Sequence, residues 1–228
     1  MAGTIQLGEP PIDVTLKHSA RARRLSLRVS GVDGRVSLTM PHRASLREAQ
    51  AFLRSKEDWI RNHLDRQPDA TAIAPGAVIP VEGHPRLIAE TRTRAVRLMD
   101  DHILIPPGDD QAGARVRAFL KTLARDRLAE ASARYSTQLG RPFGKISLRD
   151  TRSRWGSCTS EGNLMYSWRL ILAPAQVLDY VAAHEVAHLA EMNHSAAFWD
   201  EVARLMPDYQ APRKWLRNEG GALHRYHF

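Results

Sequence analysis

Two histidines and a glutamate with the spacing H-E-x-x-H occupy His184, Glu185 and His188. Residues four apart in an α-helix return to the same face, so the two imidazoles can share one metal ion. Glu185 lies about 100° around the helix, where its carboxylate is placed to act as a base and not as a ligand. The spacing therefore predicts chemistry in which a metal ion and a carboxylate act on one water molecule.

A third protein ligand would complete the site, and His194 is the nearest candidate. Zinc held by three protein ligands keeps a fourth position for water, as catalytic sites do and closed structural sites do not. A carboxylate, Glu191 or Asp200, is the alternative third ligand, and other divalent ions also suit imidazole. The competing interpretation is a buried amphipathic helix whose histidines are satisfied by hydrogen bonds in the core.

The H-E-x-x-H residues must sit on a helix, and the stretch from Pro174 to Met192 predicts one. Pro174 suits the first helical position, and an apolar stripe follows at helical spacing. Asn193 can adopt the left-handed conformation that ends helices, which would swing His194 back toward the metal.

The stretch before this helix predicts two strands, 146–150 and 163–172, joined as a hairpin by a polar loop over 151–162. A strand beside a metal-binding helix can bind an extended peptide through backbone hydrogen bonds.

Three side chains outside the metal motif are candidate substrate-binding residues. Arg152 and Arg154 could hold a substrate carboxylate or stabilise an oxyanion, or could instead pair with Asp150 or Glu161 within the loop. Tyr209 could donate a hydrogen bond to the developing oxyanion, or could be an ordinary core residue.

The remaining chain alternates between strand-like and helical patterns. Residues 14–40 alternate with period two, and Gly31–Gly34 predicts a hairpin turn there. Ser45 and Glu48 fit a capping box that opens a helix to about residue 66. Further elements are expected as strands at 78–81, 86–90, 96–99 and 102–105, and as helices at 111–139, 196–206 and 212–219. Residues 223–228 are expected to form a flexible end.

Composition limits the partners and the compartment. The net charge is +8, with 28 Arg among 33 basic residues, which indicates either a nucleic-acid partner or a solvated surface from an Arg-rich genome. No apolar run approaches about 18 residues, so we expect no membrane span. The first residues lack the apolar core of a signal peptide, and Cys158 is the single cysteine, so we expect a cytoplasmic protein.

Over roughly residues 142–216 the chain resembles the YgjP-like metallopeptidases, predicted zinc-dependent hydrolases of the zincin (gluzincin/SprT-like) group. The motifs that carry this resemblance are Arg154–Cys158, Trp168–Pro174, Leu178–Val181, His184–His188, Met192–Ser195 and Phe198-Trp199. The N-terminal part is only loosely similar. Compared with the wider metzincin pattern, Glu191 stands where those proteins have Gly, which puts the expected turn later, at Asn193.

The resemblance implies one zinc ion held by His184, His188 and His194, Glu185 as catalytic base, and hydrolysis of a peptide or protein substrate by metal-activated water. With the predicted elements it implies an α+β fold: a zincin-like core with a metal-binding helix and adjacent β-hairpin, plus a β-rich N-terminal portion. We expect a β-rich region over 1–107, with one helix at about 45–66, and a metallopeptidase domain over 108–228. The alternatives are a DNA-associated protein-processing factor and a non-catalytic metal-binding module; the oligomeric state is open.

Overall fold

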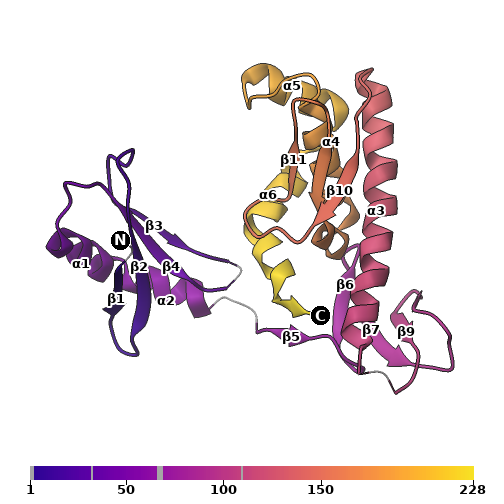
Figure 1. Cartoon of the computed structure of the whole chain (residues 1–228), viewed down its shortest axis with the longest axis horizontal. Helices are drawn as coiled ribbons and strands as arrows, with labels where there is room; N and C mark the ends of the chain where they lie inside the picture. The colour runs from indigo at the N-terminus through magenta and orange to yellow at the C-terminus, as the bar shows by residue number, and fades with distance from the viewer. Residues whose placement is uncertain (1–2, 32, 66–68, 109) are drawn as a thin grey trace. The chain divides into compact units, whose positions relative to one another are not determined.

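The computed structural model describes residues 3–31, 33–65, 69–108 and 110–228, which combine helices with mixed sheets in an α+β arrangement (Figure 1). The chain forms two compact units, Met1–Asp69 and Ala70–Phe228. Each unit encloses its own cluster of buried apolar side chains. We describe each unit by itself and call them unit 1 and unit 2.

Unit 1 contains a four-stranded sheet in the order β1-β2-β4-β3. The strands are β1 (Gly3–Leu7), β2 (Ile12–His18), β3 (Ser26–Val29) and β4 (Val36–Met40). β3 and β4 pair antiparallel, which confirms the hairpin expected around Gly31–Gly34, although Val32 lies outside the described residues. The pattern missed β1, an exposed edge strand with only Leu7 buried. Alternation along β4 buries Val36, Leu38 and Met40, as a period of two requires.

Two helices, α1 (Leu46–Ser55) and α2 (Glu57–Asp65), complete the core of unit 1 where the sequence predicts one. The capping box is confirmed: Glu48 N donates to Ser45 Oγ at 3.2 Å, and Ser45 N donates to Glu48 Oε2 at 2.7 Å. The prediction of one helix is wrong because α1 ends at Lys56, whose N–H turns back to Leu53 O. A second helix then begins with acidic residues, which favour a helix N-terminus.

Unit 2 begins with a sheet in the order β6-β7-β9-β8, formed by β6 (Val78–Val81), β7 (His84–Glu90), β8 (Arg97–Leu98) and β9 (His102–Ile105). The long helix α3 (Ala112–Leu139) follows and ends at Gly140, whose φ of 74° is left-handed as expected. Ile88 and Ile103 of the sheet lie in one buried cluster with Val116 of α3. Because of this shared core the compact unit starts at Ala70, whereas the sequence places the boundary near residue 107.

A second sheet in unit 2 has the order β10-β12-β11, with β10 (Ile146–Arg149), β11 (Gly156–Cys158) and β12 (Leu164–Ser167). The predicted hairpin between 146–150 and 163–172 is wrong, since β10 and β12 pair in parallel. The antiparallel hairpin is β11 with β12, so part of the predicted loop is itself a strand. Residues Trp168–Leu172 form a 3₁₀ segment, η1, where the sequence predicts strand. The prediction failed there because a short buried apolar run does not distinguish strand from helix.

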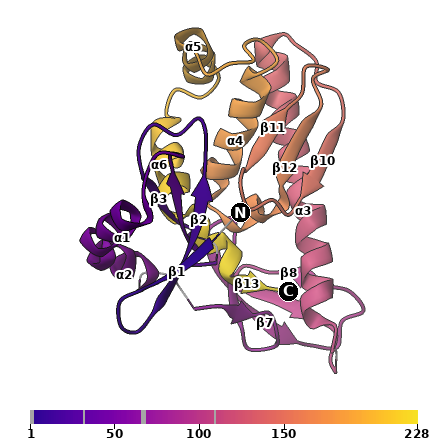
Figure 2. The same ribbon diagram turned by 60° about the vertical axis from the view of Figure 1, so that its left-hand side comes forward.

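The remaining elements are α4 (Ala175–Ala187), α5 (Ala196–Leu205), α6 (Gln210–Glu219), a 3₁₀ segment η2 (Gly220–Arg225) and β13 (Tyr226–His227) (Figure 2). β13 pairs in parallel with β5 (Thr71–Ala72). The prediction of a flexible end is therefore wrong: Leu223 and Tyr226 are buried in the core of unit 2. Over the described part of the chain, no helix combines the length and apolarity needed to cross a membrane.

A pair of matched truncations tests the core of unit 1. Leu38 is fully buried, whereas Leu46 is 55% exposed. We expect Leu38→Ala to lower the free energy of unfolding by about 2–5 kcal/mol and Leu46→Ala to change it by less than about 0.5 kcal/mol, as measured by urea denaturation. Equal effects of the two substitutions would contradict this assignment of the core.

Candidate active site

His184 and Glu185 lie in the last turn of α4 and His188 caps its end; most side chains of α4 from Val177 onward are buried. Val181, Ala182 and Val186 fill the surrounding apolar core. The polar side chains are hardly more exposed: Glu185 is 5% and His188 is 8% accessible. Ionisable groups are placed at such depth only when a partner compensates the loss of water.

Three imidazoles converge at the end of α4. One nitrogen each from His184, His188 and His194 lies within 4.8 Å of the others. The Nε2 atoms of His184 and His194 are 3.1 Å apart. Two nitrogens bound to one tetrahedral zinc ion at 2.0–2.1 Å would be roughly 3.3 Å apart. The nitrogen-only donor set and its spacing therefore fit a zinc-like ion.

A backbone carbonyl fixes the orientation of the second histidine. His188 Nδ1 lies 2.9 Å from Glu191 O, which can only accept, so Nδ1 carries the proton and Nε2 is left with its lone pair. Metal-binding histidines are commonly oriented by such a bond. His184 Nδ1, in contrast, is buried without a protein partner in the described part of the chain.

The helix ends earlier than predicted. α4 stops at Ala187, and Leu189, Ala190 and Glu191 donate to the carbonyls of Val186 and Ala187 in tight turns. The prediction that the helix reaches Met192 and that Asn193 ends it in a left-handed conformation is wrong. Within the described ranges Glu82 is the one non-glycine residue at positive φ. The tight turns after Ala187 reverse the direction of the chain, so no left-handed conformation at Asn193 is needed.

His194 reaches the other two histidines through the start of α5. Asn193 Oδ1 accepts from Ser195 N at 3.1 Å, and Ser195 Oγ caps α5 by accepting from Phe198 N at 3.3 Å. The Phe198 ring, fully buried, lies under all three imidazoles, with ring centroids 4.4–4.9 Å away. Phe198 therefore forms the floor of the histidine cluster.

The surroundings favour the neutral form of His184 and His188. Burial, reinforced by the neighbouring histidines, lowers the pKa of His184 to about 3. Burial likewise lowers the pKa of His188, against the opposing effect of its bond to Glu191 O. A neutral imidazole is the form that binds a metal.

Glu185 meets the backbone of β11. A Cβ atom added at Gly156 would lie 2.5 Å from Glu185 Oε1, so the carboxylate lies directly against the strand and only glycine fits. Burial raises the pKa of Glu185 to about 8, and the positive charge of Arg154 works in the opposite direction. Sequence reasoning missed Gly156, since the close approach joins two segments that are far apart in the chain.

A cleft of about 430 Å³ opens at the histidine cluster. It is lined by Ser153, Arg154, Gly156, Ser157, Cys158, His184, Glu185, His188, Met192 and His194. Met192 is 54% exposed at its edge. The cleft thus brings the three histidines, Glu185 and Arg154 together with the strand β11.

The other two candidate residues lie elsewhere. We call residues 220–228 the tail. Arg152 lines a separate cavity of about 310 Å³, the tail cavity, with Asp150, Arg169 and four residues of the tail. Tyr209 is not among the residues that line the cleft; its ring stacks on Tyr180 and Trp199, at centroid distances of 6.4 and 5.7 Å. Those two rings, and not Tyr209, are the ones beside His184.

Cys158 lines the cleft but is a poor nucleophile. Burial, with a smaller effect of Glu185, raises the pKa of its thiol to about 11. Its Sγ lies 3.4 Å from Thr159 O. The thiol therefore stays protonated at neutral pH and acts as a small, half-buried side chain.

Comparison with known proteins agrees with the cluster. The sequence model of the YgjP-like metallopeptidase domain matches residues 23–219. The crystal structure of the metallopeptidase zymogen of Pyrococcus abyssi abylysin is similar over 42% of this chain and 92% of that one, at 24% identity and a TM-score of 0.34. No curated protein matches the chain.

The domain match defines a metal-dependent hydrolase of the metallopeptidase class. Because it covers most of the sequence, the chain belongs to the YgjP-like family.

Metal analysis tests the histidine cluster. We expect purified protein, freed of loose metal by a weak chelator, to hold about one metal ion per chain and His194→Ala to lose it. His227→Ala is the matched control, because His227 lines the tail cavity and not the cleft. Full metal content in the His194 variant, measured by mass spectrometry, would show that another residue supplies the third ligand.

Proposed function

We propose that this protein is a zinc-dependent peptidase in which His184, His188 and His194 hold the metal ion and Glu185 is the general base. The observation that carries the proposal is the convergence of three imidazoles beside the buried Glu185 side chain at one open cleft. When bound, the metal ion supplies Lewis acidity toward the scissile carbonyl and lowers the pKa of water. A zincin-like core for unit 2 belongs to the same proposal.

Glu185 moves the proton in this reaction. Its carboxylate accepts a proton from the attacking water and then delivers it to the leaving amine, so one residue serves both halves of the hydrolysis. The absence of a side chain at Gly156 leaves the space in which the Glu185 carboxylate lies against the strand, and a larger residue would occupy that space. The catalytic group is thus oriented by packing before substrate arrives.

The strand β11 supports a peptide as the substrate. β11 is at the edge of the sheet β10-β12-β11 and lines the cleft through Gly156, Ser157 and Cys158. An extended peptide can add to such an edge through main-chain hydrogen bonds. Arg154, which lines the cleft with Glu185, is placed to bind a carbonyl or carboxylate oxygen of that peptide.

An open cleft favours catalysis over a purely structural metal site. His194 is exposed, and Met192 beside it is also exposed, so solvent and substrate reach the cluster. A structural zinc site is normally closed by four protein ligands. A cytoplasmic location, where the single thiol of Cys158 stays reduced, is part of the proposal.

The proposal is tested by removing the base while keeping its shape. We expect Glu185→Gln to lower kcat on a peptide library substrate at least about 100-fold while metal content stays the same, because the amide cannot accept the proton. Glu161→Gln, at an exposed position in the β11–β12 turn, is the control and should retain activity. Full activity of Glu185→Gln with metal bound would disprove the assignment of the base.

A second substitution tests the packing of the base. Gly156→Ala places a methyl group 2.5 Å from the Glu185 carboxylate, which must then move. We expect kcat to fall at least about tenfold with metal retained, since misplaced catalytic groups lose rate steeply. Gly3→Ala, where nothing lies within 4 Å of the added carbon, should have no effect. Unchanged kinetics in the Gly156 variant would mean that this contact does not position Glu185.

A further inference from the structure

The segment that enters β11 lies between two cavities. We call residues 151–155 the active-site loop. Ser153 and Arg154 line the cleft at the histidines, whereas Arg152 and the preceding Asp150 line the tail cavity. Residues 152–154 are exposed. The two ends of the loop, in contrast, make contacts with the tail.

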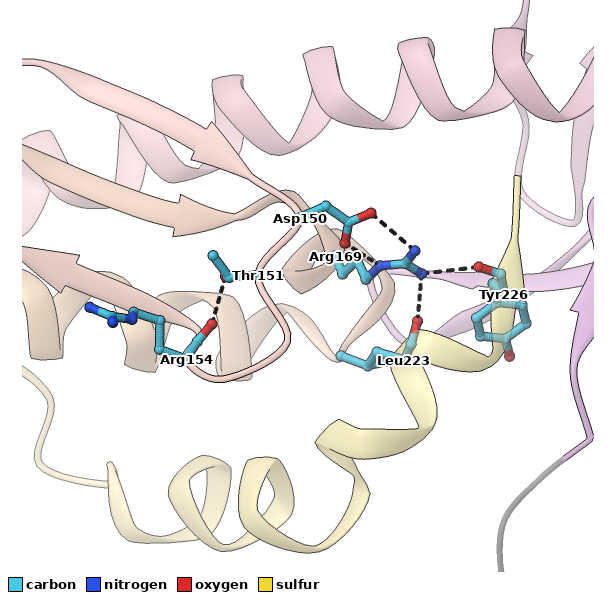
Figure 3. A network of polar contacts seen from close by, with 6 residues as sticks. All are labelled: Asp150, Thr151, Arg154, Arg169, Leu223 and Tyr226. Carbon is cyan, nitrogen blue, oxygen red and sulfur yellow. Dashed lines mark hydrogen bonds and ion pairs between the residues drawn. The ribbon is translucent and has the colours of Figure 1, made fainter. Parts of the chain in front are cut away.

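Arg169 holds the first end of the loop (Figure 3). Its Nε and Nη2 contact the two carboxylate oxygens of Asp150 at 2.6 and 3.2 Å. Its Nη1 donates to the carbonyls of Leu223 and Tyr226, at 3.1 and 3.0 Å. The planar guanidinium therefore joins the start of the loop to the tail with four contacts. The Arg169 side chain is only 11% exposed, whereas the Asp150 side chain is 45% exposed, so the two bonds to the tail carbonyls face less competition from water than the ion pair.

Trp155 holds the second end against the same tail. Its ring centroid lies 5.4 Å from that of His224. The indole also packs against Gly220, where an added Cβ would lie 3.1 Å from it. Trp155 O also accepts from Ser167 N at 2.8 Å. Inside the loop, Thr151 Oγ1 donates to Arg154 O at 2.7 Å (Figure 3). Both ends of the loop are thus tied to residues 220–226.

The tail is rigid enough to serve as an anchor. β13 pairs with β5, and Ile73 N donates to His227 O at 2.8 Å. Phe228 packs edge-on against the buried Trp168, with ring centroids 5.1 Å apart. Leu223 is buried in the core of unit 2.

We infer that Arg169 is a positioning residue for the active site: it clamps the active-site loop to the tail and so holds Arg154 and the Gly156 backbone at the cleft. Arg169 lines the tail cavity and is not among the residues that line the cleft, so it acts only through the loop. The consequence for catalysis rests on the function proposed above, whereas the clamp itself does not.

Trypsin reports on the loop independently of any peptidase activity. Cleavage after Arg152 or Arg154 requires the loop to leave its place, and intact mass spectrometry identifies the fragments. We expect Arg169→Gln to be cut there at least about tenfold faster than the wild type. We also expect its kcat/KM on a peptide to fall by a similar factor, with the metal content unchanged.

Arg204→Gln is the matched control. Arg204 also joins a carboxylate, Glu201, to a backbone carbonyl, that of Gln138, but touches neither the loop nor the tail. This variant should keep the trypsin resistance and the kcat/KM of the wild type. Equal acceleration of loop cleavage in both variants would reduce the effect to general destabilisation and overturn the clamp.

Two milder variants keep the inference testable if Arg169→Gln fails to fold. Arg169→Lys keeps the charge but cannot span the carboxylate and both carbonyls, and Asp150→Asn keeps the bonds of Arg169 to the tail. Both should speed cleavage after Arg152 or Arg154 by an intermediate factor, and the double variant Asp150→Asn/Arg169→Gln should be cut no faster than Arg169→Gln alone. Wild-type resistance in both would overturn the clamp. Faster cleavage in a protein without peptidase activity would uphold the clamp and reject the proposed function.

Discussion

The side chains of His184, Glu185 and His188 lie at the end of α4 against a core that is otherwise apolar, and the cost of removing them from water governs what surrounds them. His188 is satisfied by a carbonyl of the turn that ends the helix. The imidazoles share the face of Phe198, and the carboxylate of Glu185 lies against a strand that has no side chain at Gly156. The turn that ends α4 thus satisfies His188, α5 packs Phe198 on the imidazoles, and β11 leaves space for Glu185.

The site is assembled from segments that are distant in sequence. α4 and the segment between α4 and α5 supply the histidines, β11 supplies one wall of the cleft, and the tail contacts both ends of the loop before β11. Tyr180 and Trp199 stand beside His184 and are backed by Tyr209, while Arg213 lies 4.0 Å from the Trp199 ring. The rigid packing of these layers limits how far any single part can move.

Local patterns predicted the parts of the site that are local in sequence. The spacing of His184 and His188, the helix expected at 196–206 and the nearness of His194 all follow from neighbouring residues. Patterns failed where partners come from elsewhere in the chain. The apolar run at 168–172 forms a 3₁₀ segment and not a strand, and the tail pairs with β5. Arg152 and Arg154 line different cavities. Tertiary contacts decide such cases, and a single sequence does not display them.

The tail is made last during protein synthesis, so its contacts with earlier segments form late. A ribosome makes His184, His188 and His194 before it makes Leu223 and Tyr226, whose carbonyls complete the contacts of Arg169. β5 likewise waits for β13, although β5 is made before every other strand of unit 2. Pairing between such distant segments is among the slow steps of folding. The contacts that join Asp150, Arg169 and the tail are therefore among the last that unit 2 can form, because they need residues up to Tyr226.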